Sequence, residues 1–440
     1  MIGLIMFIAA LLMLIIGFPV AFTFGAVALI FGAIAAYFEL AQDGAVLFID
    51  WLDEFLSMFS MMPLRIYTIM ENKILIAIPL FIFMGVVLEK SGIAQKLLES
   101  MGSLFGKVRG GLAVSTVIIG TMLAASTGVV GASVIAMGVI ALPVMLKHGY
   151  NKGIATGTIC ASGTLGQIIP PSIVLIILAD VFNQPVGDLF KAAIMPSIIL
   201  VGAYIIYILA IANIKKDIAP AMKDININFK NIIVSLIPPL VLILLVLGSI
   251  FAGIATATES ASVGAVGSLI LAAFYKKLNF KLIEQASLEA VKTTSMVFAI
   301  LIGATAFSMV FTYSGADYIV EDFLTSLPHA KMVFIFLVMA IIFFLGFFID
   351  FIEISYIVVP ILLPVADSLG INPIWFAILI AMNLQSSFLT PPFGFSLFYL
   401  RGVAPKEVTT IDIYKGVIPF ILIQVTILIL MVFFPHIFGF

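Results

Sequence analysis

The sequence predicts an all-α membrane protein with an inverted internal repeat, about ten crossing segments of which two are broken, and two re-entrant hairpins. Three observations support this fold class: the composition, the spacing of the apolar runs and the similarity of the two halves of the chain. Of 440 residues, 63% are apolar and 10% are charged, and the mean hydropathy is +1.28. A soluble domain of this length needs far more charge to cover its surface. The formal net charge of −2 gives no indication of a nucleic-acid partner.

Residues that often carry enzyme chemistry are sparse. The single cysteine, Cys160, lies in an apolar run, so neither a disulfide framework nor a cysteine metal cluster is expected. The histidines His148, His329 and His436 are far apart, and no HExxH motif occurs. We therefore expect no catalytic residue, no cofactor and no enzymatic activity. The apolar N-terminus, 1–16, lacks the basic region and cleavage site of a signal peptide and is interpreted as a retained first span.

Apolar runs of the length that spans a bilayer, roughly 20 residues, recur along the chain. They lie near 2–18, 20–37, 75–89, 192–213, 232–252, 257–274, 293–311 and 416–437. Four further segments are longer and interrupted, namely 111–146, 153–183, 332–366 and 374–401.

The loop charges predict which ends of these spans face the cytoplasm, because Lys and Arg concentrate in cytoplasmic loops. Basic residues gather in the loops 90–110, 147–152, 215–230 and 276–292. Acidic residues dominate the loops 38–74 and 312–331, which we place outside. This pattern predicts a multi-pass protein of the bacterial inner membrane with both termini in the periplasm.

The segment 111–146 starts and ends at basic loops that both belong on the cytoplasmic side. A segment of this length that returns to its own side predicts a re-entrant helical hairpin, with its tip at Ser126, Thr127 and Gly128. Two ordinary spans joined by a tight turn remain the alternative. Each would have only about 17 residues, which is the short limit for a crossing helix.

The second half of the chain repeats the first. At a constant offset of 221 residues, four features match, namely Pro143 with Pro364, Gly149 with Gly370, Asn151 with Asn372, and Pro170-Pro171 with Pro391-Pro392. Corresponding loops differ in charge, since the basic 90–110 matches the acidic 312–331. The halves are therefore expected to face opposite sides, which is the architecture of many secondary transporters.

The repeat also predicts the domain organisation. We expect N-terminal scaffold spans and an outer amphipathic loop in 1–74, the first repeat in 75–213, central scaffold spans in 214–292, and the second repeat in 293–440.

Each repeat supplies one crossing segment that a proline pair interrupts. The first runs through 161–172 and the second through 383–394. A proline pair removes two backbone donors, and the carbonyls it frees need polar partners inside a membrane. Together with Ser, Thr, Asn and Gln oxygens they are hard ligands suited to Na⁺, and the half-helix that follows attracts a carboxylate at its N-terminus. The alternative is that each proline pair merely kinks a helix.

Asp350 and Glu353 are the acidic residues of the otherwise apolar second hairpin. Intramembrane acids usually serve as ion ligands or proton carriers. The alternative is a shallow hairpin with both acids at its aqueous mouth.

Several segments resemble the DctM-type large subunit of tripartite ATP-independent periplasmic (TRAP) transporters, in order along nearly the whole chain. They are 77–81, 109–113, 147–153, 162–166, 169–172, 383–384 and 389–394. The resemblance implies the ion-transporter-type fold of divalent-anion/sodium symporters, with a scaffold and a moving transport domain. It also implies Na⁺-coupled elevator transport, a four-helix DctQ-type membrane subunit and a DctP-type periplasmic binding protein.

Carried over by motif, the family's sodium sites fall where each hairpin tip meets a broken crossing. The first set is Thr127, Gly128, Gly163, Thr164 and Pro170, and the second is Asp350, Asn383, Thr390, Pro391 and Gly394. Sodium is the single metal expected. As substrate-binding residues we expect Ser126, Ser162, Gln167, Glu353, Gln385 and Ser387.

The chain departs from the family pattern at both hairpin tips. The first has Thr127-Gly128-Val129-Val130 where Ser-Gly-Ser-Ser is common, and the second has Asp350-Phe351-Ile352 where Asp-Thr-Thr is common. Because these hydroxyl groups are absent, we expect backbone carbonyls to supply more of the ion ligands. The Phe351-Ile352-Glu353 variant and the 399–405 ending resemble a branch linked to 2-oxo acids and related monocarboxylates. A one-component Na⁺/anion symporter of the same fold is the alternative function.

Overall fold

The computed structural model describes residues 1–44, 46–92, 96–97, 101, 104–127, 130–222 and 229–440, and the regular structure in this part of the chain is helical. The expected all-α class is therefore confirmed. The contacts divide the chain into two compact units. Unit 1 comprises 1–73, 292–341 and 348–373, and unit 2 comprises 74–291, 342–347 and 374–440. The domain boundaries expected from the repeat stay a prediction.

Unit 1 is built from the N-terminal helices and from parts of the second half. Its helices, with two that continue into unit 2, are α1 (Ile2–Ile16), α2 (Val20–Asp43), α3 (Phe48–Met58), α4 (Met62–Glu71), α14 (Phe280–Tyr313), α15 (Ala316–Thr325), α16 (Ala330–Leu345), α17 (Phe351–Glu353), a π-helical turn (Ile354–Val358) and α18 (Val359–Ser368). The amphipathic α3 folds back on α2, since Trp51 Nε1 donates to the Ala33 carbonyl at 2.9 Å.

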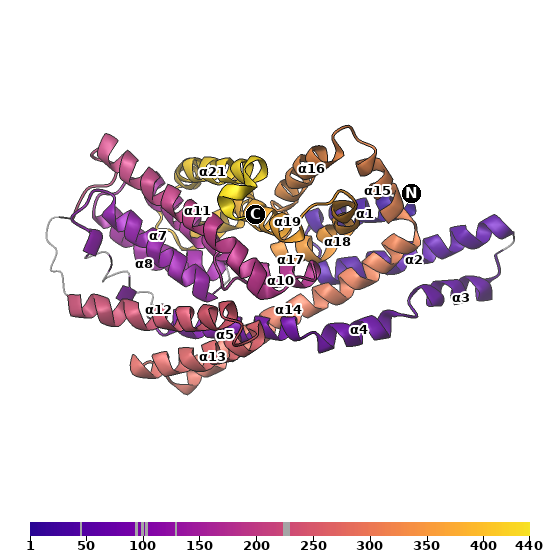
Figure 1. Cartoon of the computed structure of the whole chain (residues 1–440), viewed down its shortest axis with the longest axis horizontal. Coiled ribbons are helices and arrows are strands. Elements are labelled where there is room, and N and C mark those ends of the chain that lie inside the picture. The colour runs from indigo at the N-terminus through magenta and orange to yellow at the C-terminus, as the bar shows by residue number, and fades with distance from the viewer. Residues whose placement is uncertain (45, 93–95, 98–100, 102–103, 128–129, 223–228) are drawn as a thin grey trace. The chain divides into compact units, whose positions relative to one another are not determined.

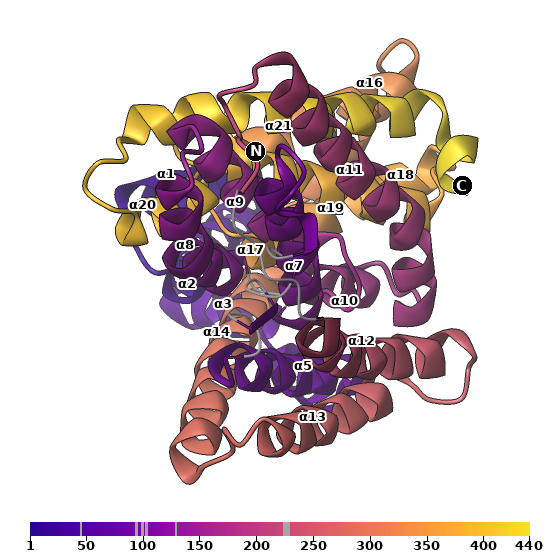
Figure 2. The ribbon, with the colours of Figure 1, turned by 90° about the vertical axis from the view of Figure 1, so that its left-hand side faces the viewer.

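Unit 2 contains the first hairpin and both broken crossings (Figure 1). Its helices are α5 (Lys73–Lys90), α7 (Gly111–Thr127), α8 (Val130–Lys147), α9 (Lys152–Thr164), α10 (Ile173–Val181), α11 (Val186–Ile214), α12 (Phe229–Phe251), α13 (Ala257–Phe274), α19 (Pro373–Leu389), α20 (Phe395–Val403) and α21 (Thr410–Phe433). Helices α12 and α13 pack side by side (Figure 2).

Local sequence signals explain where several helices begin and end. Thr256 and Glu259 form a capping box at the start of α13, and Thr409 and Asp412 form one at the start of α21. Gly17 ends α1 in the left-handed conformation, at φ 100°, which costs a glycine little.

Eight helices of the described residues are long and apolar enough to cross a membrane, or up to nine if the bent pair Phe48–Glu71 and Lys73–Lys90 forms one span. Six of the eight overlap spans expected from the sequence. The expected first span is shorter than that length, because α1 has 15 residues. The other two, Val130–Lys147 and Phe351–Ser368, belong to the expected hairpins. Because these arms are long enough to cross, their length does not distinguish re-entrance from crossing, and re-entrance stays a prediction.

Three of the basic loops lie together at one end of unit 2. Gly110 N donates to the Ala219 carbonyl at 2.9 Å, and Asn151 N donates to the Ile218 carbonyl at 2.9 Å. Tyr150 also reaches back across the hairpin, since its hydroxyl accepts from Leu112 N at 3.1 Å. Burial raises the pKa of this hydroxyl, which therefore stays neutral near neutral pH. The first hairpin thus begins and ends beside the same loop.

The two broken crossings run in opposite directions along α21. Gly153, at the start of α9, packs against the start of α21, where an added Cβ on Gly416 would lie 2.2 Å from its carbonyl oxygen. Trp375, at the start of α19, donates to the carbonyl of Met431 near the other end of α21 at 3.1 Å. Tyr414, near the start of α21, donates to the Pro392 carbonyl beyond the end of α19 at 2.9 Å. An inverted repeat requires this antiparallel arrangement, although the repeat as a whole stays a prediction.

Candidate functional site

The first crossing is interrupted where the sequence places its proline pair. Helix α9 ends at Thr164, a 3₁₀ turn covers Leu165–Gln167, and α10 begins at Ile173. The bond between Pro170 and Pro171 is cis. Ser172 caps α10, where its hydroxyl accepts from Leu175 N at 3.5 Å. The break is buried throughout its length.

The second crossing is interrupted in the same way. Helix α19 ends at Leu389 and α20 begins at Phe395, and the Pro391-Pro392 bond between them is cis. The hydroxyl of Thr390 donates to the Ser386 carbonyl, one turn earlier, at 2.7 Å. Both predicted interruptions are thus present in the fold.

Serine hydroxyls satisfy carbonyls at both breaks. Ser172 Oγ donates to the Gln167 carbonyl at 2.8 Å, and Ser396 Oγ donates to the Phe388 carbonyl at 2.9 Å. Gln167 and Phe388 correspond under the 221-residue offset. Ser197 on α11 adds a third such bond, to the Ile168 carbonyl at 3.2 Å. Part of the backbone polarity at each break is therefore satisfied within unit 2 itself.

A glycine of each hairpin packs closely against a serine of a broken crossing. An added Cβ on Gly120, in α7, would lie 2.5 Å from Ser162 Cβ in α9. An added Cβ on Gly346, after α16, would lie 2.1 Å from Ser387 Oγ in α19. Both contacts are inside unit 2. Each hairpin therefore reaches its crossing at a point where a larger residue would not fit.

The first predicted sodium set belongs to unit 2. Gly163 packs against Val134 of α8, where an added Cβ would lie 2.3 Å from Val134 Cγ2. Thr164 and Pro170 are buried, and Thr164 Oγ1 donates to the Ala161 carbonyl at 3.0 Å. Thr127 is the last residue of α7, and Gly128 lies outside the described residues. Gly163 and Thr164 thus lie at the end of α9, next to the break. The ion site itself stays a prediction.

The second predicted set is divided between the two units. Asn383, Thr390, Pro391 and Gly394 belong to unit 2, and Gly394 fits tightly, because an added Cβ would lie 2.6 Å from the Phe388 carbonyl oxygen. Asp350 belongs to unit 1, where its carboxylate accepts from Phe351 N at 2.7 Å and caps α17. This site too stays a prediction.

The part of the second hairpin that belongs to unit 1 contains buried polar groups beside Asp350. Glu353 is 5% exposed, and its Oε2 atom has no hydrogen-bond partner among the described residues. The Ser355 hydroxyl, fully buried one step into a π-helical turn, is likewise unpartnered within that part of the chain. π-Helical turns often occur at functional sites.

The remaining substrate-binding candidates are buried on the two crossings. Ser162, Gln167, Gln385 and Ser387 are all 0% exposed, while the side chain of Ser126 lies outside what the structure describes. The hydroxyls of Ser162 and Ser387 donate to carbonyls of their own helices, at 3.1 and 2.8 Å. They retain lone pairs that could accept from a ligand or coordinate an ion.

The residues that bond the carbonyls at the breaks, or pack closely beside them, were not predicted from the sequence. Ser172 follows Pro171 directly and could have been found from its N-cap position. Ser396, Ser197, Gly120 and Gly346 gave no local signal. Their roles depend on contacts between helices that are far apart in the sequence. Among the described residues, no group of three or more His, Cys, Asp or Glu side chains is placed to hold a metal.

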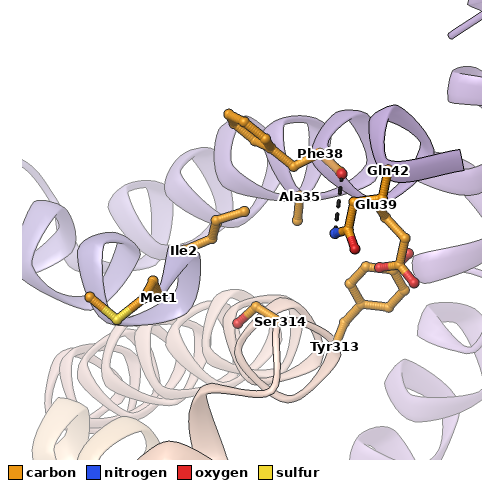
Figure 3. A pocket seen from close by; sticks show the side chains of 8 residues that line it. All are labelled: Met1, Ile2, Ala35, Phe38, Glu39, Gln42, Tyr313 and Ser314. Carbon is orange, nitrogen blue, oxygen red and sulfur yellow. Dashed lines mark hydrogen bonds between the residues drawn. The ribbon is translucent and has the colours of Figure 1, made fainter. Parts of the chain in front are cut away.

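An open pocket of about 380 Å³ lies elsewhere, in unit 1, between α1, α2 and α14 (Figure 3). Glu39 and Gln42 of α2 and Tyr313 of α14 line it, and the Tyr313 hydroxyl donates to Glu54 at 2.5 Å. None of the predicted site residues lines this pocket.

The helical fold, the helices of membrane-spanning length and the paired breaks are typical of multi-pass membrane transport proteins. Residues 7–437 match the family model of the tripartite ATP-independent periplasmic transporter, DctM component. The chain therefore belongs to the DctM family of TRAP transporter large permease subunits. Members of this family act as transport permeases rather than as enzymes.

Two curated relatives agree with this assignment, and one solved structure agrees with the fold. The chain is 31% identical to a C4-dicarboxylate TRAP transporter large permease protein of Pseudomonas aeruginosa, over 85% of this chain and 87% of that protein. It is 29% identical to a sialic acid TRAP transporter permease protein of Haemophilus influenzae, over 83% of this chain and 59% of that protein. The YdaH transporter of Alcanivorax borkumensis matches with a TM-score of 0.59 at 14% identity, covering 87% of this chain and 89% of that one, which supports the fold.

Proposed function

We propose that this chain is the translocating subunit of a Na⁺-coupled importer of a small organic acid, delivered by a periplasmic binding protein. Family membership supports the role of large permease. The observation that carries the proposal is the pair of antiparallel breaks, of which the first is buried and the second partly exposed. At each break a serine hydroxyl bonds a backbone carbonyl, and a hairpin glycine packs against a serine of the helix before the break. Broken helices of this kind form the ion and substrate sites of secondary transporters.

At each break, oxygen atoms would coordinate Na⁺ and polar groups would bind the acid. Thr164 and Thr390 each have a hydroxyl oxygen with lone pairs left to accept, and carbonyls near the proline pairs supply further oxygens. The N-termini of α10 and α20 begin directly after the breaks, so their helix dipoles favour a carboxylate there. Bound Na⁺ compensates the charge of the anion, which is the physical basis of coupling.

The transport cycle that we propose is an elevator movement of a domain that contains the hairpins and broken crossings. A four-helix membrane subunit would support the stationary scaffold, and the periplasmic binding protein would dock at the outer side. The chain would lie in the bacterial inner membrane with both termini in the periplasm.

The substrate class that we propose is a 2-oxo acid or a related monocarboxylate. The C4-dicarboxylate and sialic acid named for the two relatives are both carboxylates, which supports an organic acid. The Phe351-Ile352-Glu353 tip and the 399–405 segment support the 2-oxo acid class by resemblance. A one-component Na⁺/anion symporter of the same fold, which needs no partner, is the second candidate function.

Uptake into proteoliposomes tests the proposal. We expect saturable uptake of a radiolabelled 2-oxo acid that requires an inward Na⁺ gradient, the small membrane subunit and the loaded binding protein. A C4-dicarboxylate and a sialic acid serve as competing substrates. Uptake that does not depend on the gradient would contradict the coupling, and full uptake by the chain without partners would favour the one-component symporter.

A further inference from the structure

A tyrosine of α21 forms a hydrogen bond to the turn that interrupts the second crossing. Tyr414 lies in the second turn of α21, and its hydroxyl donates to the carbonyl of Pro392 at 2.9 Å. Both residues belong to unit 2. The hydroxyl thus joins a continuous helix to the middle of the second break.

The ends of this turn are bonded within the second crossing itself. Thr390 Oγ1 donates to the Ser386 carbonyl at 2.7 Å, and Gly394 N donates to the Thr390 carbonyl at 3.0 Å. The middle of the turn has no such donors, because Pro391 and Pro392 lack a backbone N–H. A donor from another helix can therefore fix the proline pair, and α21 supplies one.

The first break receives a comparable bond from a different helix. Ser197 of α11 donates to the Ile168 carbonyl at 3.2 Å. The first break is buried throughout, whereas Pro392 and Phe393 of the second break are exposed. An exposed turn has fewer packing contacts that restrict it, so a hydrogen bond to a neighbouring helix contributes more to its order.

The start of α21 is well fixed within unit 2. Thr409 and Asp412 form the capping box of this helix. An added Cβ on Gly416, two residues after Tyr414, would lie 2.2 Å from the Gly153 carbonyl oxygen, so α21 contacts the start of α9 backbone to backbone. The bond from Tyr414 therefore fixes the proline turn of the second crossing relative to the start of the first crossing.

We propose that Tyr414 is a positioning residue for Na⁺ at the second break. Its bond to Pro392 orders the proline turn before an ion binds, so the Pro391 carbonyl and the Thr390 hydroxyl need little further ordering to coordinate Na⁺. Tyr414 acts through Pro392 and is not itself an ion ligand. This inference rests on the proposed function, because it assumes that the second break binds Na⁺.

Hydrogen–deuterium exchange with mass spectrometry, on the full chain in Na⁺-free nanodiscs with any subunit that co-purifies, tests the positioning. Tyr414→Phe removes the hydroxyl and keeps the ring. We expect the backbone amides of 389–400 to exchange several-fold faster than in the wild type, and those of 161–175, at the first break, to be unchanged. Wild-type exchange rates at 389–400 would overturn the proposal.

Tyr207→Phe is the matched control. The ring of Tyr207, on α11, packs against Phe420 of α21 with the ring centroids 5.2 Å apart, and its hydroxyl makes no hydrogen bond to the residues that the structure describes. Exchange at 389–400 should equal that of the wild type in this variant. An equal acceleration in both variants would overturn the assignment to the bond between Tyr414 and Pro392.

The Na⁺ dependence of uptake into proteoliposomes, with the partner proteins present, tests the link to the ion. In Tyr414→Phe the Na⁺ concentration for half-maximal uptake should rise several-fold, while the maximal rate and the Tm stay near the wild-type values, because the ligands remain. A lower maximal rate at an unchanged half-saturating concentration would overturn the role in Na⁺ binding. Wild-type uptake that is independent of Na⁺ would overturn the proposed function and this role together, whatever the exchange result shows for the turn.

Discussion

At the scale of single residues, glycine decides how closely the first broken crossing can be packed. An added Cβ on Gly157, in α9, would lie 2.1 Å from the Gly416 carbonyl oxygen of α21. On the neighbouring faces of α9, Gly163 contacts Val134 of α8, and Ser162 lies under Gly120 of α7. The backbone of α9 is therefore enclosed by three helices at van der Waals distance, which small residues permit in membrane proteins.

Gly157→Ala tests this packing directly. The added methyl group must displace backbone, which typically costs about 1–3 kcal/mol, so the Tm of the purified protein should fall by several degrees. Gly202→Ala, in α11, is the matched control, because an added Cβ there meets no atom within 4 Å. It should leave the Tm unchanged or raise it slightly, since alanine favours a helix over glycine. Equal Tm values for both variants would contradict the close packing of α9 on α21.

At the scale of elements, each break is a place where side chains replace the helical hydrogen bonds that proline removes. The hydroxyls of Ser172 and Ser396 perform this role on corresponding carbonyls, those of Gln167 and Phe388. Because these hydroxyls satisfy the carbonyls within the protein, the carbonyls can lie in an apolar environment while the half-helices on either side stay folded.

Ser172→Ala and Ser396→Ala should each destabilise the protein, because a buried carbonyl is left without its donor at a cost of about 1–3 kcal/mol. The effects should be similar at the two breaks, and thermal unfolding followed by size-exclusion chromatography measures them. Ser262→Ala is the control, since this exposed serine donates only to the Thr258 carbonyl of its own helix. A loss at one break with none at the other would argue against their equivalence.

Much of this architecture can be predicted from the sequence, because proline pairs, long apolar runs and loop charges are local signals. Both interruptions, at Pro170-Pro171 and Pro391-Pro392, occur where they are expected. What the sequence does not predict are contacts between distant segments, such as Gly346 on Ser387. Likewise Gln424 has no local pattern that distinguishes it from a polar residue at a helix surface, although it is fully buried.

At the scale of the whole molecule, the two crossings run in opposite directions along α21, so one begins near the end where the other breaks. Two broken crossings of opposite direction, each with its own polar groups, provide a transporter with equivalent half-sites that face its inner and outer sides. Family membership as a TRAP large permease is consistent with such machinery. The coupling of substrate to Na⁺ at these half-sites is the central claim of our proposal.

The entry of ²²Na⁺ into proteoliposomes, driven by substrate-loaded binding protein without an imposed Na⁺ gradient, tests this claim most directly. We expect substrate-dependent ²²Na⁺ entry for the wild type, and a strong reduction in Thr390→Ala and Asp350→Asn, which remove proposed ion ligands. Asp180→Asn, near the end of α10, should behave like the wild type. Substrate uptake without accompanying ²²Na⁺, or an equal loss in all three variants, would contradict the account.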